Sequence, residues 1–120
     1  MKSFYKKNVI ITGAASGIGR LMAVAFAREK ANIAMIDINR KALEKTVSEM
    51  AGLKAKVYAY TCDMGNRREV AATVKLIKRD FEKIDILINN AGIVIGKKVL
   101  DLTIDEIQKT MDVNFMGPVM

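Results

Sequence analysis

The sequence predicts an α/β fold in which a doubly wound parallel sheet, with strand order 3-2-1-4, is truncated after about four strands. Two observations predict it. Short apolar runs typical of buried strands alternate with segments whose apolar residues recur at helical spacing. In addition, every loop of unusual chemistry follows a strand, and such loops share one edge of a parallel sheet. Strands joined through helices pair in parallel by right-handed crossovers.

The first two predicted elements are a strand over Asn8–Thr12 and a helix over residues 18–29. The strand is short, apolar and β-branched, as buried strands are. The helix follows a glycine turn, and the helical spacing of its apolar residues predicts that they form its buried stripe. These residues are Ile18, Leu21, Met22, Ala25 and Phe26.

The next predicted elements are a strand over residues 32–36, which ends at Asp37, and a helix that runs to about Met50. Asn39 can cap this helix at its N-terminus, and Gly52 is placed to close it at the other end. Its predicted apolar stripe consists of Leu43, Val47 and Met50.

A third strand over residues 56–61 precedes a third helix. Asn66 can cap this helix, which runs to about Phe81. Its predicted inward residues are Val70, Val74 and Ile77. A fourth strand over residues 84–88 leads into a turn at residues 89–92, and Thr103 can cap a fourth helix from residue 104. This order leaves the fourth strand with an open edge and its flanking helix partly uncovered. Such surfaces associate, so we expect a homo-oligomer.

Composition narrows the class of protein. The 120 residues form one domain or part of one, 51% of them are hydrophobic, and Cys62 is the single cysteine. A chain without an internal disulfide suits a reducing compartment, so we expect a cytoplasmic protein. No stretch approaches the ~20 apolar residues of a membrane span. The formal charge is +7, but the basic residues are spread as short pairs, so a solvated surface is favoured over nucleic-acid binding.

The glycine turn between the first strand and the first helix predicts a phosphate-binding loop. Gly13 permits the tight turn, Gly17 lets the backbone approach a pyrophosphate, and Gly19 lets the helix pack against the strand. The helix then directs its unpaired N–H groups and the positive end of its dipole at the anion. The alternative is a turn that merely connects strand to helix, and the flanking elements favour a dinucleotide site.

Acidic residues after the second and third strands extend the predicted site. Asp37 can accept hydrogen bonds from both adenosine ribose hydroxyls and would repel a 2′-phosphate. Neither Ile38 nor Ser16 supplies the positive charge that a 2′-phosphate needs, so NAD is favoured over NADP. The alternative for Asp37 is an acid that stabilises the helix after it. Asp63 can accept from the adenine amino group, with Met64 on the ring, or it is an ordinary turn aspartate.

Residues after the fourth strand complete the predicted site. Asn90 carries an amide that can bond neighbouring strands and loops, while Ala91 and Gly92 leave room for a cofactor ribose. Asn114 lies within the predicted fourth helix, where asparagine is a poor helix former, so a buried polar role is favoured over an exposed position. No metal site is expected.

These motifs together resemble the short-chain dehydrogenase/reductase family over the whole chain, which implies an NAD(P)-binding Rossmann domain over residues 1–120. Residues 12–19 resemble the family's Thr-Gly-x-x-x-Gly-x-Gly cofactor motif. This implies that the cofactor is bound by Gly13, Ser16, Gly17, Ile18 and Gly19. Residues 19–21 and 37–40 are most similar to the retinol and hydroxysteroid dehydrogenase branch.

The resemblance also implies roles for residues further along the chain. Asp37 falls where NAD-preferring members carry an acid, and Asp63 matches the adenine-contacting aspartate. Residues 89–92 match the family's Asn-Asn-Ala-Gly motif. Asn114 matches the asparagine of the catalytic tetrad, which holds a water in the proton relay.

One departure from the family's pattern limits the prediction. The family's catalytic Ser and Tyr-x-x-x-Lys are absent: no tyrosine has a lysine four residues on, and no serine follows Ser48. The resemblance therefore implies the cofactor-binding half of an NAD(P)-dependent oxidoreductase that transfers a hydride between NAD(H) and an alcohol/carbonyl substrate. This half is expected to be inactive alone. The alternative is a non-catalytic NAD(H)-binding module that acts as a sensor or scaffold.

Overall fold

The chain is built around a five-stranded sheet with the order β3-β2-β1-β4-β5, in a computed structural model that describes residues 4–89 and 92–95. The strands are β1 (Asn8–Thr12), β2 (Asn32–Asp37), β3 (Val57–Thr61), β4 (Ile86–Asn89) and β5 (Gly92–Ile95), and the helices are α1 (Gly17–Arg28), α2 (Arg40–Glu49) and α3 (Arg67–Asp80). β1 pairs in parallel with β2 and with β4, and β2 pairs in parallel with β3. The predicted doubly wound order 3-2-1-4 is therefore confirmed.

The fifth strand is a difference from the prediction. β5 runs antiparallel to β4, with Gly92 opposite Asn89 and Ile95 opposite Ile86. The edge of β4 that was expected to stay open is therefore paired. Residues 92–95 read Gly-Ile-Val-Ile, and such β-branched residues favour a strand once a neighbouring strand is available. The helix predicted from residue 104 lies outside the described residues.

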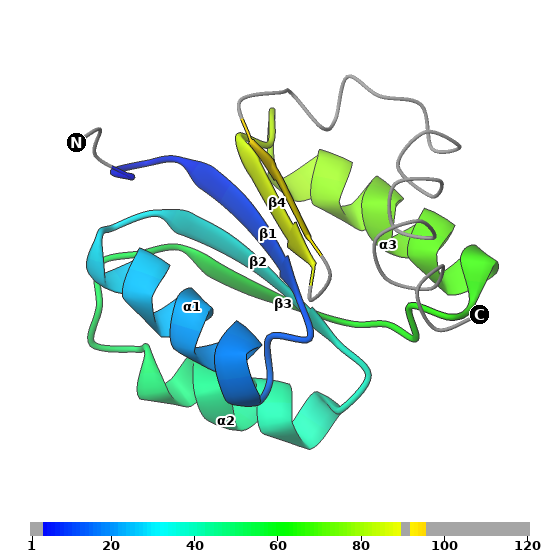
Figure 1. Ribbon diagram of the computed structural model, residues 1–120, viewed down its shortest axis with the longest axis horizontal. Helices are drawn as coiled ribbons and strands as arrows, with labels where there is room; N and C mark the ends of the chain where they lie inside the picture. Colours follow the sequence, from blue (N-terminus) through cyan, green and yellow to red (C-terminus); the bar gives the residue numbers. More distant parts are fainter. Residues whose placement is uncertain (1–3, 90–91, 96–120) are drawn as a thin grey trace.

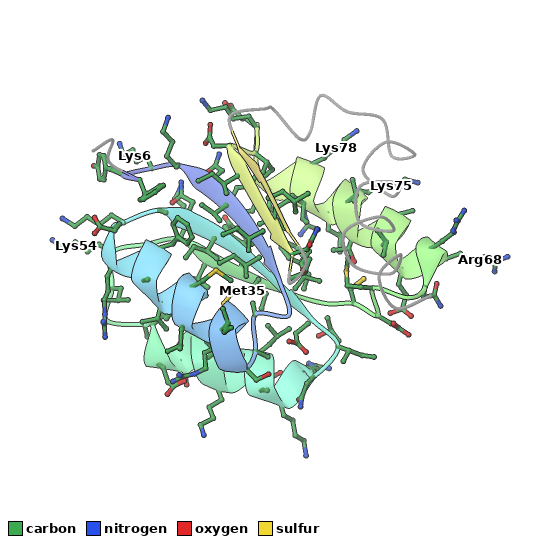
Figure 2. All side chains as sticks on the ribbon, in the orientation of Figure 1. Lys6, Met35, Lys54, Arg68, Lys75 and Lys78 are labelled. Atoms are coloured by element: carbon green, nitrogen blue, oxygen red, sulfur yellow. The ribbon has the colours of Figure 1, made fainter. Side chains whose placement is uncertain are left out.

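Helices cover both faces of the sheet: Figure 1 shows α1 and α2 on one face and α3 on the other. Each face has its own apolar core, because successive side chains of a strand point to opposite sides. The strand residues in the core under α3 include Ile10, Ile36 and Leu87, and those under α1 and α2 include Val9, Ile11, Ile33, Met35 and Ile88. Figure 2 shows Met35 between the sheet and α1.

The packing of α1 corrects its predicted stripe. The buried residues of this helix are Gly19, Ala23 and Ala27. In contrast, Ile18 and Leu21 are 72% and 63% exposed, and Ala25 is exposed as well. Met22 and Phe26 are half-buried at the flank of the helix. Small side chains let the helix backbone lie close to the strands, and Met22 and Phe26 pack against the same core from its margin. The predicted stripe is therefore wrong for Ile18, Leu21 and Ala25 and partly confirmed for Met22 and Phe26.

The N-termini of α2 and α3 are capped as predicted. Asn39 Oδ1 accepts a hydrogen bond from Ala42 N at 3.0 Å. Asn66 Oδ1 accepts from the N–H groups of Arg68 and Glu69 at 3.0 and 3.1 Å. Each cap satisfies N–H groups that the first helical turn leaves without an intrahelical partner. The predicted inward faces are largely confirmed, since Leu43, Met50, Val70, Val74 and Ile77 are buried and Val47 is half-buried.

The C-terminal end of α2 differs from the prediction. Met50, not a glycine, is the C-cap, and Gly52 does not adopt the left-handed conformation. The last turn is tightened instead by hydrogen bonds from Met50 N to Val47 O at 3.0 Å and from Ala51 N to Ser48 O at 3.3 Å. Such i to i−3 bonds satisfy terminal carbonyl groups without a glycine.

The basic side chains point away from the molecule in several directions. Figure 2 shows Arg68, Lys75 and Lys78 on the side of α3, and Lys6 and Lys54 on the opposite side of the molecule. This spread favours the predicted solvated surface over a single basic patch. Across the described residues, no helix combines the length and the hydropathy that a membrane crossing requires.

A group of hydrogen-bonded side chains joins β3 to α3. Tyr60 Oη donates to Asp80 Oδ2 at 2.7 Å, and Arg79 donates to the same carboxylate from Nε at 2.9 Å and from Nη2 at 3.1 Å. The bonds from Arg79 first, and then that from Tyr60, hold the pKa of Asp80 below its usual value. Burial first, and then Asp80, raise the pKa of Tyr60 well above its usual value. The group is therefore stable with a charged carboxylate and a neutral phenol.

We expect Tyr60→Phe to lower the free energy of unfolding most between about pH 6 and pH 9. Because the folded pKa of Asp80 lies below its unfolded value, its stabilisation is complete above about pH 4 and is lost as the pH falls through the folded pKa. Because the folded pKa of Tyr60 lies above its unfolded value, its stabilisation is complete below about pH 10 and is lost as the pH rises further. Urea unfolding of both proteins from about pH 2.5 to about pH 11 measures the difference, which should shrink below about pH 4 and above about pH 10. A difference that stayed constant over that whole span would contradict the prediction.

Candidate functional site

The loops that follow β1, β2 and β3 meet at the carboxyl edge of the sheet. A pocket of about 300 Å³ lies between them. Its lining residues are Gly13, Asp37, Ile38, Cys62, Asp63, Met64 and Gly65. In an open parallel sheet, this edge is where ligands bind, on either side of the strand at which the order reverses. Here β1 is that strand, because β2 and β4 flank it.

The loop after β1 has the conformation of a phosphate cradle. Gly13 and Gly17 both adopt positive φ, at 62° and 57°, a region that strains residues with side chains. Gly19 lies so close to the loop that an added Cβ would overlap the carbonyl oxygen of Gly13. The helix therefore begins directly against the glycine turn, as the spacing of the three glycines predicted.

The first turn of α1 offers N–H groups to an anion. Ser16 is the N-cap with an extended backbone, and its side chain makes no capping hydrogen bond within residues 4–89 and 92–95. The first turn also carries no acidic side chain. Free N–H groups and the positive end of the helix dipole remain directed at the loop, which is the arrangement that binds phosphate.

Asp37 lies beside this loop at the end of β2. Its Oδ2 accepts a hydrogen bond from Ala15 N at 3.0 Å, and its Oδ1 accepts from Asn39 N at 2.9 Å. An ionised carboxylate oxygen can accept more than one hydrogen bond, so both oxygens keep acceptor capacity for a ligand hydroxyl. The bond to Asn39, next to the start of α2, also agrees with the alternative prediction that Asp37 stabilises that helix.

Asp63 and Met64 lie across the pocket from the glycine loop. Asp63 Oδ1 accepts from Gly65 N at 2.8 Å, which confirms the turn aspartate that was one of its two predicted roles. Its contact with an adenine amino group stays a prediction. Met64 is 9% exposed and joins the core under α3. Burial raises the pKa of the Cys62 thiol, so this side chain stays neutral at the wall of the pocket.

The structure brings most of the predicted residues together at this edge. The residues concerned are Gly13, Ser16, Gly17, Ile18, Gly19, Asp37, Ile38, Asp63 and Met64. Gly92 is paired with Asn89 at the end of β4, so it lies at the same edge of the sheet. Asn90, Ala91 and Asn114 lie outside the described residues.

Sequence reasoning missed three contributors to this site. Cys62 and Gly65 line the pocket, and their only signal was their position next to Asp63 and Met64. Ala15 contributes its backbone N–H to Asp37, which no side-chain motif could indicate. In the described part of the chain, no group of three or more acidic, cysteine or histidine side chains is arranged to hold a metal ion.

Comparison with protein families gives one match that spans almost the whole chain. The family described as short chain dehydrogenase matches residues 7–120. Among curated proteins, epidermal retinol dehydrogenase 2 of Mus musculus is 46% identical over 109 residues, which cover 89% of this chain and 35% of that protein. Estradiol 17-beta-dehydrogenase 11 of Macaca fascicularis is 39% identical over 116 residues, which cover 97% of this chain and 39% of that protein.

Comparison with solved structures gives the same fold. The crystal structure of NAD+-bound xylitol dehydrogenase matches with a TM-score of 0.71 and 41% sequence identity. The match covers 76% of this chain and 35% of the other. The chain therefore spans little more than a third of the length of each of these three proteins.

Proposed function

Because this chain belongs to the short-chain dehydrogenase family, we propose that it is the dinucleotide-binding part of an NAD(H)-dependent oxidoreductase. One observation above all supports the proposal: Asp37 Oδ2 lies 3.0 Å from the N atom of Ala15, in the glycine loop. The diphosphate and the adenosine ribose of a dinucleotide are covalent neighbours. A phosphate cradle and a carboxylate at this separation suit both groups of one ligand.

The residues present fit such a cofactor. The N–H groups at the start of α1 would bind the diphosphate, and Asp37 would bind the ribose hydroxyls. Ile38, which is 65% exposed, and Met64 offer apolar surface to the adenine. When bound, a nicotinamide cofactor supplies a carbon that gives or accepts a hydride. The residues of this chain hold the adenosine end and thereby orient the rest.

The charges around the glycine loop support NAD(H) over NADP(H). Arg20 and Arg40 are near the site in sequence and could attract a 2′-phosphate. However, Arg20 Nη2 lies 2.7 Å from Glu49 Oε2, and Arg40 Nε lies 3.0 Å from Glu44 Oε1. Each guanidinium therefore has a carboxylate partner on α2, but these pairs are exposed and weak. The stronger support is the carboxylate of Asp37, which adjoins the loop and would repel the phosphate.

We expect Asp37→Ala to lower the preference for NADH over NADPH by about tenfold to 100-fold, because it removes two charge-assisted hydrogen bonds to the ribose and one source of repulsion. Fluorescence titration of the folded chain with NADH and with NADPH gives the two dissociation constants. Glu82→Ala is the control, because Glu82 is exposed beyond the far end of α3. An unchanged ratio in Asp37→Ala would refute the ribose assignment.

The proposed reaction is reversible hydride transfer between the cofactor and an alcohol/carbonyl pair. Its support is the family and the names of its relatives, which are dehydrogenases of retinol, estradiol and xylitol. The second candidate is a non-catalytic NAD(H)-binding module, which the same glycine loop and Asp37 would serve equally well. A chimera that joins this chain to the part of a relative that it does not match tests the two candidate functions. Hydride transfer by the chimera supports the enzyme, and cofactor binding without turnover supports the module.

The cytoplasmic location and the homo-oligomer stay predictions.

A further inference from the structure

We propose that Asp37 is a positioning residue for the glycine loop as well as a ligand of the adenosine ribose, a double role that rests on the proposed cofactor binding. Its two carboxylate oxygens accept backbone N–H groups from two segments of the chain. Oδ2 accepts from Ala15, which is 22 residues away in the sequence, and Oδ1 accepts from Asn39. One side chain therefore joins the loop after β1 to the start of α2.

The bond to Ala15 continues the pairing of β1 with β2 into the loop. The register of the two strands ends with Thr12 beside Ile36, and Ala14 N then donates to Ile36 O at 3.2 Å. The next N–H group, that of Ala15, is taken by the side chain of Asp37 at 3.0 Å. The carboxylate thus holds the last residue before Ser16, the N-cap of α1.

This position matters because the N–H groups that suit a diphosphate begin immediately after Ala15. Their direction depends on the backbone between Gly13 and Gly17, where both glycines have positive φ. If the Ala15 N–H lost its acceptor, that backbone would gain conformational freedom, and a ligand would have to order it again. Asp37 therefore preorganises the diphosphate site in addition to recognising the sugar.

The two roles need different properties of residue 37. Repulsion of a 2′-phosphate needs negative charge, whereas the bond to Ala15 needs only an acceptor oxygen in the right place. Asp37→Asn removes the charge and keeps one acceptor, Asp37→Ala removes both, and Asp37→Gln moves the acceptor by one methylene. In Asp37→Asn the oxygen is expected to face Ala15, because that bond is partly buried, whereas the bond from Asn39 is exposed and water can replace it.

The first experiment needs no cofactor. Amide hydrogen exchange, measured by NMR on the full chain, reports the protection of the Ala15 N–H. We expect protection to fall about fivefold in Asp37→Ala and in Asp37→Gln, and to stay within about twofold of the parent in Asp37→Asn. Asp85→Asn is the matched control, because Asp85 Oδ2 accepts the backbone N–H of Asn8 at 2.9 Å, at the opposite end of β1. It is expected to leave Ala15 unchanged.

The second experiment compares NADPH binding by the uncharged variants. If charge were the only property that mattered, Asp37→Asn and Asp37→Ala would bind NADPH equally well. Because an asparagine amide can also bond the ribose, a difference in affinity supports the positioning role only where the protection of Ala15 changes in the same variants. The positioning role predicts that Asp37→Asn binds NADPH about threefold to tenfold more tightly, because its loop stays ordered. Asp37→Gln is expected to resemble Asp37→Ala, and it replaces that variant if the alanine protein does not fold.

The outcomes separate this inference from the proposed function. Unchanged protection of Ala15 in Asp37→Ala and Asp37→Gln, or equal NADPH affinities of the asparagine and alanine variants, would overturn the positioning role. A different result would overturn the proposed function alone: the parent chain binds neither NADH nor NADPH, yet Asp37→Ala and Asp37→Gln still lose the protection of Ala15. The hydrogen bond from Ala15 to Asp37 would then be supported as a bond that orders the loop.

Discussion

Gly19→Ala is expected to weaken NADH binding by about 100-fold or more and to destabilise the fold. A Cβ at this position would overlap the carbonyl oxygen of Gly13, and it would lie 2.8 Å from the carbonyl carbon of Gly13 and 3.2 Å from Cα of Ala14. All three are backbone atoms, so none of them can rotate away. The start of α1 must move off the glycine loop, which withdraws the N–H groups from the diphosphate. The loss of two hydrogen bonds to a charged group corresponds to about 3 kcal/mol or more.

The matched control for this prediction is Gly52→Ala. A Cβ on Gly52 meets no atom within 4 Å, and its backbone lies outside the left-handed region. The same chemical change is therefore expected to alter stability by no more than about 1 kcal/mol, and to increase it if anything, since alanine narrows the unfolded ensemble. Thermal unfolding and NADH titration of both variants test the pair. Equal NADH affinities of the two variants would show that the helix does not need its close approach to the loop.

The glycine loop is also where sequence reasoning was most successful. Gly13, Gly17 and Gly19 could be interpreted from the sequence because the backbone requires glycine at these positions. Positive φ at two of them and the close approach of the helix at the third exclude residues with side chains. The strand order could be predicted for a similar reason. Alternating strands and helices leave few topologies once crossovers are right-handed. Backbone requirements of this kind can be recognised in the sequence because they restrict which residue types can occur at a position.

Features that depend on which segments lie close together in the folded chain could not be predicted in this way. The hydrophobic spacing of α1 selected Ile18 and Leu21, yet the helix packs on the sheet through Gly19, Ala23 and Ala27. Hydrophobicity ranks side chains by transfer energy, but the close contact of this helix is decided by their size. The bond from Ala15 N to Asp37 was beyond prediction because an alanine carries no sign of what its backbone N–H donates to. The antiparallel pairing of β5 likewise depends on an edge that only the folded sheet provides.

Ile33→Ala is expected to lower the free energy of unfolding by about 2–5 kcal/mol. Ile33 is fully buried at the start of β2, in the core under α1 and α2. Removal of its outer carbons leaves a cavity between a strand and two helices that are held by their own neighbours, so the site can collapse only in part. A typical domain has only about 5–15 kcal/mol of stability. Urea denaturation should show a lower midpoint with an unchanged slope.

Ile38→Ala makes the same chemical change five residues further on, and it is expected to lower NADH affinity while leaving the stability of the fold nearly unchanged. Ile38 is 65% exposed and lines the pocket beside Asp37, so its loss should change stability by no more than about 0.5 kcal/mol. If adenine covers this side chain, NADH affinity should instead fall about threefold to tenfold, because the ligand loses apolar contact area. Ile33→Ala, measured at a temperature where it is fully folded, should bind NADH nearly as well as the parent. If Ile38→Ala destabilised the fold and left NADH affinity unchanged, the isoleucine would be structural, and the pocket would have to be assigned to another ligand.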